Sequence, residues 1–130
     1  MIIIDGTNMA LGRMASYAAK QALKGEDVRV VNCKDIVITG NRKAILAEFK
    51  EKKSKVGSGF GGPKHSLVAE KVAKRAIRGM IPNHREGRGR EAIKRVKCFK
   101  GLPDEFKDKE MIKQEKAGKV KFWKLSEVLK

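Results

Sequence analysis

The N-terminal segment Ile2-Ile3-Ile4-Asp5-Gly6-Thr7-Asn8 joins three β-branched residues directly to four turn-forming residues. The β-branched run predicts a short strand, and Asp-Gly-Thr-Asn is typical of a turn that leads from a strand into a helix. Small and apolar side chains then recur at helical spacing from about residue 10 to 24, and Gly25 is placed as the helix stop. A strand followed at once by a helix indicates an α/β fold.

The alternation of strands and helices continues towards the C-terminus. We expect strands at 28–31, 36–39 and 96–99, helices at 41–53, 68–80 and 86–95, and a loop at 54–66. Asn41 is the candidate N-cap of the helix at 41–53, and Glu48 and Lys52 pair four residues apart on its surface. This rhythm predicts a small parallel sheet with helices on both faces. Residues 1–103 form the expected domain, and residues 104–130 form a charged C-terminal extension. The extension can dock through its apolar residues, which are Val120, Phe122, Trp123, Leu125, Val128 and Leu129.

The composition points to a soluble domain that binds a polyanion. The 130 residues include 31 Lys and Arg against 15 Asp and Glu, a formal charge of +16, while 41% of the residues are hydrophobic. Such an excess favours nucleic acid or an anionic membrane as the partner. The sequence has neither an apolar run of about 18 residues nor a signal peptide, so we expect a cytoplasmic chain. Cys33 and Cys98 predict reduced thiols rather than a disulfide or a metal site.

Most of the charge excess lies between residues 64 and 100, where 12 Lys and Arg face 3 Asp and Glu. On the expected helix 68–80 the cations occupy one side, and the other side carries Ala69, Val72, Ala73, Ala76, Ile77 and Met80. Acid–base pairs four residues apart, at Glu70–Lys74, Glu86–Arg90 and Glu91–Arg95, account for only part of the charge. Small apolar residues suit a protein core better than a membrane surface, so nucleic acid is favoured.

The aromatic residues indicate how nucleic acid is held. The chain has seven aromatic residues, and none lies between residues 61 and 98. Base stacking is therefore disfavoured, and recognition of folded RNA through phosphates and shape is favoured. The segment Gly57-Ser-Gly-Phe-Gly-Gly62 spells a dinucleotide-binding pattern but lacks the strand before it and the helix after it. We expect this loop to approach RNA closely, with Phe60 as a candidate wedge, or else to be a plain surface loop.

Three residues could suggest an enzyme. Asp5 ends a strand, and His65 and His84 are the two histidines. Each histidine lies in a basic stretch and no carboxylate pair is evident, so phosphate contact or simple exposure is favoured, and Asp5 is suited to capping its turn. We therefore expect no catalysis, no cofactor and no metal.

Five segments together resemble the family of the thirteenth protein of the large ribosomal subunit, the universal L-thirteen family. The segments are Leu11-Gly-Arg-Met-Ala-Ser16, Thr39-Gly-Asn41, Arg78-Gly-Met-Ile-Pro82, Gly87-Arg-Gly-Arg90 and Val96-Lys-Cys-Phe-Lys-Gly-Leu-Pro103. The resemblance covers about residues 2–103, and Gly62-Pro-Lys-His65 is similar to the archaeal and eukaryotic branch. It implies a three-layer α/β/α sandwich around a four-stranded parallel sheet of order 3214. It also implies a non-catalytic role in binding large-subunit ribosomal RNA and supporting subunit assembly, beside neighbouring ribosomal proteins.

We predict one continuous phosphate-binding surface, with Gly79 and Pro82 shaping the turn within it. Its residues are Lys53, Lys55, Lys64, His65, Lys71, Arg75, Arg78, Arg85, Arg88, Arg90 and Lys94. Two alternatives use the same sequence features. One is a small nucleotide-binding enzyme with Asp5, the glycine loop and His65 around a phosphate, and the other is an RNA-binding translational regulator outside the ribosome.

Overall fold

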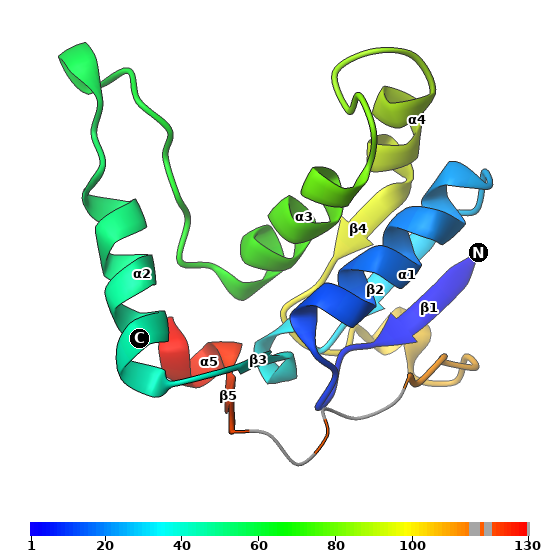
Figure 1. Ribbon diagram of the computed structural model, residues 1–130. Coiled ribbons are helices and arrows are strands. Elements are labelled where there is room, and N and C mark those ends of the chain that lie inside the picture. The colour runs from blue at the N-terminus through cyan, green and yellow to red at the C-terminus, as the bar shows by residue number, and fades with distance from the viewer. Residues whose placement is uncertain (115–117, 119–120, 130) are drawn as a thin grey trace.

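The computed structural model describes residues 1–114, 118 and 121–129, and its centre is a parallel sheet (Figure 1). Strands β1 (Ile2–Asp5), β2 (Val28–Val31) and β4 (Val96–Cys98) lie in the order β1-β2-β4, with Ile4 opposite Val30 and Val30 opposite Cys98. The α-helices are α1 (Leu11–Leu23), α2 (Arg42–Ser54), α3 (Ala69–Met80), α4 (Gly87–Arg95) and α5 (Leu125–Val128). The expected mixed α/β class and its elements up to residue 98 are confirmed.

One face of the sheet is covered by α1, α3 and α4. Ile4, Val28 and Val30 alternate along their strands toward this face and are fully buried. The buried side of α1 is mostly alanine, which lets α3 approach it closely. Most of the buried apolar residues belong to this one interface. Each buried Ile or Val contributes about 1.5–3 kcal/mol to folding, so the interface supplies most of the stabilisation by the core.

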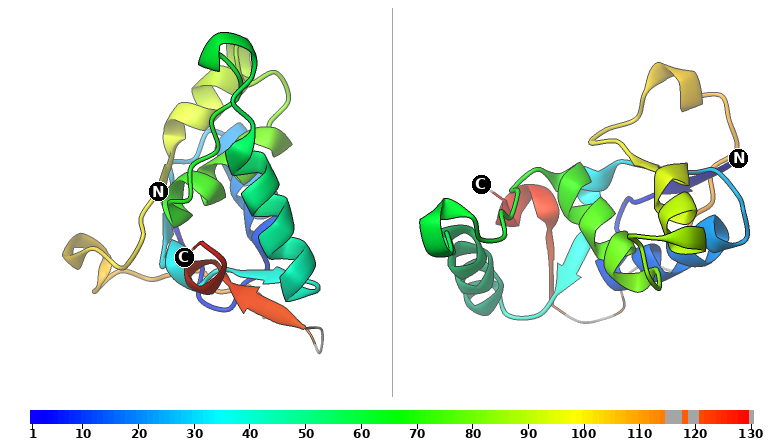
Figure 2. Two further views of the ribbon diagram at one scale, coloured as in Figure 1. Left: turned by 90° about the vertical axis from the view of Figure 1, so that its left-hand side faces the viewer. Right: turned by 90° about the horizontal axis from the view of Figure 1, so that it is seen from above.

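The opposite face has a much smaller cover than the expected helical layer. Ile3 and Val31 point to this face and pack against Phe106, which lies in the 3-10 turn Asp104–Phe106. Phe99 packs on Phe106 with ring centroids 5.6 Å apart. Figure 2 shows this segment on the side of the sheet away from the helices. Among the described residues, only two apolar strand residues, Ile3 and Val31, are buried on this face, so Phe106 and the side chains around it are enough to cover them.

The expected strand 36–39 does not join the parallel sheet. Asn32 has a left-handed conformation, with φ 56°, and a 3-10 turn at Cys33–Asp35 follows it. This turn carries the chain away from β2, whose free edge is then paired with β4. Strand β3 (Val37–Thr39) instead pairs antiparallel with β5 (Phe122–Lys124) from the C-terminal extension. The sheet among the described residues thus has three strands rather than four.

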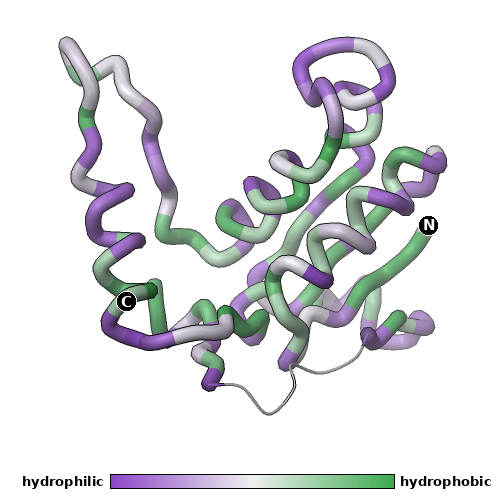
Figure 3. The backbone as a smooth tube through the Cα atoms, viewed as in Figure 1, coloured by the Kyte–Doolittle hydropathy of each residue, from purple (hydrophilic) through white to green (hydrophobic). Residues whose placement is uncertain are grey.

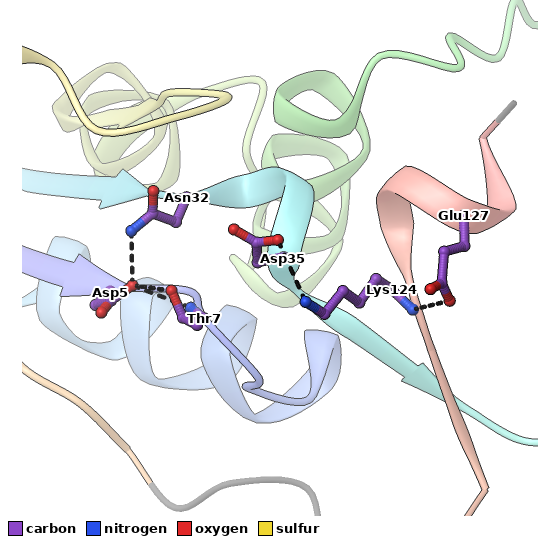
Figure 4. Close-up of polar contacts among 6 residues, drawn as sticks. All are labelled: Asp5, Thr7, Asn32, Asp35, Lys124 and Glu127. Atoms are coloured by element: carbon purple, nitrogen blue, oxygen red, sulfur yellow. Dashed lines mark hydrogen bonds and ion pairs between the residues drawn. The ribbon is translucent and has the colours of Figure 1, made fainter.

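The extension docks through part of the apolar set that was expected. Leu125 and Val128 are buried, and the Leu125 N–H donates to the Ile36 carbonyl at 2.8 Å. Phe122 is 44% exposed and does not take part in this packing, while Val120 lies outside the described residues. The Lys124 ammonium lies 3.7 Å from Asp35 and ties the segment to the 3-10 turn before β3, while the Lys124 N–H donates to Glu127 within the segment (Figure 4). The Trp123 indole N–H donates to the Gly40 carbonyl at 3.2 Å.

The outer edge of β1 is also paired. The Ile112 N–H donates to the Ile3 carbonyl at 2.8 Å, and the Asp5 N–H donates to the Ile112 carbonyl at 3.0 Å. Ile112 therefore forms a single parallel bridge with Ile4. This bridge satisfies two backbone groups on a sheet edge that would otherwise be exposed.

Asp5 ties the ends of β1 and β2 together. Its carboxylate accepts hydrogen bonds from the Thr7 N–H at 3.0 Å, the Thr7 hydroxyl at 2.7 Å and the Asn32 amide at 3.0 Å (Figure 4). Burial raises the pKa of Asp5, but these donors, with Lys113 at 3.7 Å, outweigh it and leave the pKa below its ordinary value. This bonding supports the turn-capping role.

Replacing Asp5 by alanine is expected to lower the free energy of unfolding by about 1–3 kcal/mol at pH 7, because Thr7 and Asn32 lose their acceptor. The lowered pKa stabilises the native state above the unfolded pKa of about 3.9, and this contribution disappears as the pH falls through the folded value. Urea unfolding at pH 7, 4 and 3 should show that the difference in free energy of unfolding between Asp5→Ala and the wild type becomes smaller as the pH falls. Asp108→Ala, at an exposed carboxylate, should show neither effect.

The connection between α3 and α4 accounts for the Arg78–Pro82 segment. Ile81 is buried and ends α3, and Asn83 adopts a left-handed conformation with φ 49°. Gly89, in the first turn of α4, is buried against the backbone of Pro82 and Asn83. The turn is therefore shaped by Pro82 and Gly89, while a Cβ added to Gly79 would meet open space.

Candidate nucleic-acid interface

Helix α2 and the loop after it project away from the sheet (Figures 1 and 2). Asn41 caps α2, because its side-chain oxygen accepts a hydrogen bond from the Lys43 N–H, as the sequence predicts. Ile45 is the one buried residue of this helix, and Figure 3 shows most of α2 as hydrophilic. A cleft is left between α2, the returning loop and α3.

The cleft has a volume of about 550 Å³ and a strongly basic lining. Its basic residues come from α2, the loop and α3, and they are Lys52, Lys64, His65, Lys71, Lys74, Arg75 and Arg78. Within the described part of the chain, no Asp or Glu lines it. Three separate segments thus bring positive charge to one concave surface, which suits a polyanion.

The loop is held against α3 by backbone and side-chain contacts. The Arg75 guanidinium donates to the Lys64 carbonyl at 3.2 Å, and the Ser66 hydroxyl accepts a hydrogen bond from the Val68 N–H at 3.2 Å. These contacts keep Lys64 and His65 at the mouth of the cleft. Arg75 therefore both orders the loop and contributes charge.

The glycine-rich tip is a closed loop without the geometry of a dinucleotide site. The Gly62 N–H donates to the Val56 carbonyl at 3.0 Å, and a Cβ on Gly57 would lie 2.4 Å from the Gly62 Cα. The next helix, α3, begins only at Ala69. Phe60 at the tip is 78% exposed and has a positive φ of 57°.

The eleven predicted residues fall into three places in the structure. Five of them line the cleft, namely Lys64, His65, Lys71, Arg75 and Arg78. Lys53 and Lys55 are exposed at the end of α2, where Lys55 pairs with Glu51 at 3.5 Å. Arg85 precedes α4, and Arg88, Arg90 and Lys94 lie on it, all exposed. The cleft therefore gathers about half of the predicted set.

Two predicted residues on α4 have partners in the same chain. Arg88 donates two hydrogen bonds, at 2.7 and 3.2 Å, to the Leu23 carbonyl at the end of α1. Lys94 pairs with Glu91 at 3.4 Å, although the sequence had suggested Arg95 as the partner of Glu91. Arg95 instead donates to the Ala22 carbonyl. Arg88 and Arg95 thus satisfy carbonyl groups at the C-terminal end of α1, where positive charge is favourable.

Sequence reasoning missed several residues of the cleft. Lys52 and Lys74 were assigned to ion pairs on their own helices, and the Glu48–Lys52 pair is indeed present at 2.5 Å, yet both lysines also line the cleft. The floor is apolar and comes from four helices, with Leu11, Phe49, Val72, Ala76 and Ile93. Helical periodicity shows that Val72 and Ala76 face inward, but it cannot show that Phe49 lies opposite them.

His65 is electrostatically coupled to its basic neighbours. Partial burial, and after it the positive charges of Arg75, Lys52 and Lys55, lower the pKa of His65. His65 is therefore mostly neutral at pH 7 in the free protein. A bound phosphate would offset those charges and favour the imidazolium form.

The remaining candidate groups have structural environments. Cys33 is fully buried, and the neighbouring Cys98 thiol, together with burial, raises its pKa, so it is an inert thiol. In the described ranges no cluster of His, Cys, Asp and Glu could hold a metal ion. No helix among them is long and apolar enough to cross a membrane. Asp5, at the end of β1, and the glycine loop lie in different parts of the molecule (Figures 1 and 4).

Comparison with known proteins identifies the family. The model of the family described as ribosomal protein L13 matches residues 1–105. The large ribosomal subunit protein uL13 of Methanosarcina barkeri is 41% identical over 113 residues, 86% of this chain and 79% of that protein. The protein of the same name from Thermoplasma volcanium is 42% identical over 103 residues, 79% and 74% of the two chains. Both organisms are archaea, as the resemblance to that branch implies. The chain belongs to the ribosomal protein L13 family.

Proposed function

We propose that this chain is a structural constituent of the large ribosomal subunit and binds large-subunit ribosomal RNA through the basic cleft and the exposed cations beside it. The observation that carries the proposal is the convergence of seven basic side chains from three segments on one concave surface. The names of the two relatives, large ribosomal subunit protein uL13, support the ribosomal setting. The role is structural rather than catalytic, at the cytoplasmic ribosome, among neighbouring ribosomal proteins and without a cofactor, a small-molecule substrate or a membrane partner.

The basic surface extends beyond the cleft along α3. Lys71 and Lys74 line a second, shallower hollow together with Lys97 of β4 and one carboxylate, that of Glu70. A phosphate backbone that passes over α3 can therefore contact cations on both sides of the helix. Arg85 and Arg90, exposed around α4, continue this surface. The chain thus supports assembly of the large subunit, because these cations hold segments of ribosomal RNA close to one another.

We also propose that the chain consists of an RNA-binding domain, residues 1–103, and an extension, residues 104–130, which completes the fold. The bridge between Ile112 and Ile4 supports the role of the extension in completing the fold, because it pairs the outer edge of β1.

Salt dependence tests the proposed function. If about eight phosphates are engaged, the logarithm of the binding constant should fall against the logarithm of salt concentration with a slope of about −6 to −7. Filter binding of protein-free large-subunit RNA at several salt concentrations measures this slope, and co-sedimentation with large subunits in high salt provides the second readout. A slope near −1, or saturable binding of a mononucleotide that resists salt, would contradict the proposal.

RNA binding is expected to strengthen by about three- to fivefold as the pH falls from 7.5 to 5.5, because binding raises the lowered pKa of His65 and takes up a proton. The same titration with His65→Gln should be nearly flat over this range. His84→Gln changes the other histidine and should retain the dependence. Equal pH dependence in the two variants would show that His65 does not contact phosphate.

A further inference from the structure

The cleft combines two surfaces that a phosphate backbone alone would not use. Cations such as Lys64, Lys71 and Arg78 line it, while the floor is formed by apolar side chains, chiefly Phe49 and Val72. An A-form duplex presents phosphates and sugar edges and keeps its bases stacked inside, so it would cover the cations and leave the floor in water. The floor therefore needs an occupant with an apolar, flat part attached to negative charge.

We infer that the cleft binds one unpaired nucleotide of the RNA, with its base on the apolar floor beside Phe49 and its flanking phosphates on the surrounding cations. The inference rests on the proposed function and adds to it the local form of the RNA, a nucleotide turned out of its stack. The volume of about 550 Å³ lies within the range of small-ligand sites and accommodates a nucleoside.

Phe49 is placed to contact a base. It comes from α2, its side chain is half-buried rather than packed into the core, and Val72 and Ala76 of α3 form another part of the same floor. The Lys52 ammonium lies over the ring, 6.0 Å from its centroid. A base that packs against this ring would thus bring its own phosphates close to Lys52. Aromatic contact of this kind tolerates any base, because every base has a π-face.

Charge decides between a nucleotide and the other plausible occupant, an apolar segment of a neighbouring protein. Such a segment would have to carry several carboxylates to match Lys64, Lys71, Arg75 and Arg78 while also filling the floor. A nucleotide has both parts in one unit, and its neighbours along the strand supply further phosphates. The basic lining therefore favours RNA in the cleft.

Two RNA probes with equal charge test the inference on the full chain. One is a single-stranded heptamer of adenosine nucleotides, and the other is the same ribose-phosphate heptamer without bases. At low salt the wild type should bind the adenosine heptamer on the order of tenfold more tightly than the abasic heptamer. Phe49→Leu keeps an apolar side chain but removes the ring, so it should lower this ratio towards one and leave abasic binding unchanged.

Phe60→Leu is the matched control, because it changes an exposed aromatic residue at the loop tip outside the cleft lining. It should leave the ratio unchanged, and both variants should melt at the wild-type temperature. Binding of both heptamers with a ratio near one would overturn the inference and leave the proposed function standing, since the floor would then serve another occupant. A ratio that depends on Phe60 and not on Phe49 would also overturn it. Failure of both heptamers to bind would count against the proposed function itself.

Discussion

Replacing Gly89 by alanine is expected to lower the free energy of unfolding by about 3 kcal/mol, at the upper end of the cost of overpacking. A Cβ at this position would lie 2.2 Å from the Pro82 carbonyl oxygen and 2.4 Å from that of Asn83. Both atoms belong to the backbone, so no rotation of a side chain can relieve the contact. The turn must move away from α4, and Ile81, buried just before it, must move as well.

Urea unfolding of Gly89→Ala and Gly79→Ala measures this effect with a matched control. Gly79 lies in α3 in the adjoining segment, and nothing comes within 4 Å of its added Cβ. Gly79→Ala should be neutral or stabilising by about 0.5–1 kcal/mol, because alanine is the better helix former. Similar destabilisation by both changes would mean that the Pro82–Gly89 contact does not hold the turn.

The sequence is most informative where local rules and the fold agree. Gly25 ends α1 with φ 99°, and Asn41 caps α2, as their residue types predict. Helical spacing correctly places Ala69, Ala73 and Ile77 in the core. Met80 has the same phase but is 44% exposed, because it is the last residue of α3.

The site was harder to predict because it is formed by segments far apart in the sequence. The charge of residues 64–100 identifies α3 as basic, but only the position of α2 shows that Lys52 and Phe49 face it across the cleft. Arg88 resembles its basic neighbours in sequence, and its bonds to the Leu23 carbonyl depend on how α4 packs against α1. Long-range pairing is likewise the reason that β3 was assigned to the wrong sheet, since its partner β5 comes more than 80 residues later.

Changing Arg75 and Arg78 together to alanine is expected to weaken binding of large-subunit RNA by about 60-fold at 0.1 M salt, because each phosphate contact contributes a factor of about eight there. The salt slope should become shallower by about two. Both side chains are exposed, so the melting temperature should change little, even though Arg75 loses its bond to the Lys64 carbonyl. Filter binding across a salt series measures the affinity and the slope together.

A second double variant separates the position of charge from its amount. Lys107 and Lys109 follow the 3-10 turn on the other face of the sheet, away from the cleft, and changing both to alanine removes the same formal charge. Long-range attraction alone would make the two double variants equally weak. If the phosphates contact the cleft, the Lys107 and Lys109 variant should keep nearly all of the wild-type salt slope. Those two lysines would then contact no phosphate and displace no counterions from the RNA. Equal salt slopes in the two double variants would therefore mean that the RNA binds elsewhere on the molecule. A large fall in the melting temperature of the Arg75 and Arg78 variant would mean that these residues stabilise the fold rather than bind RNA.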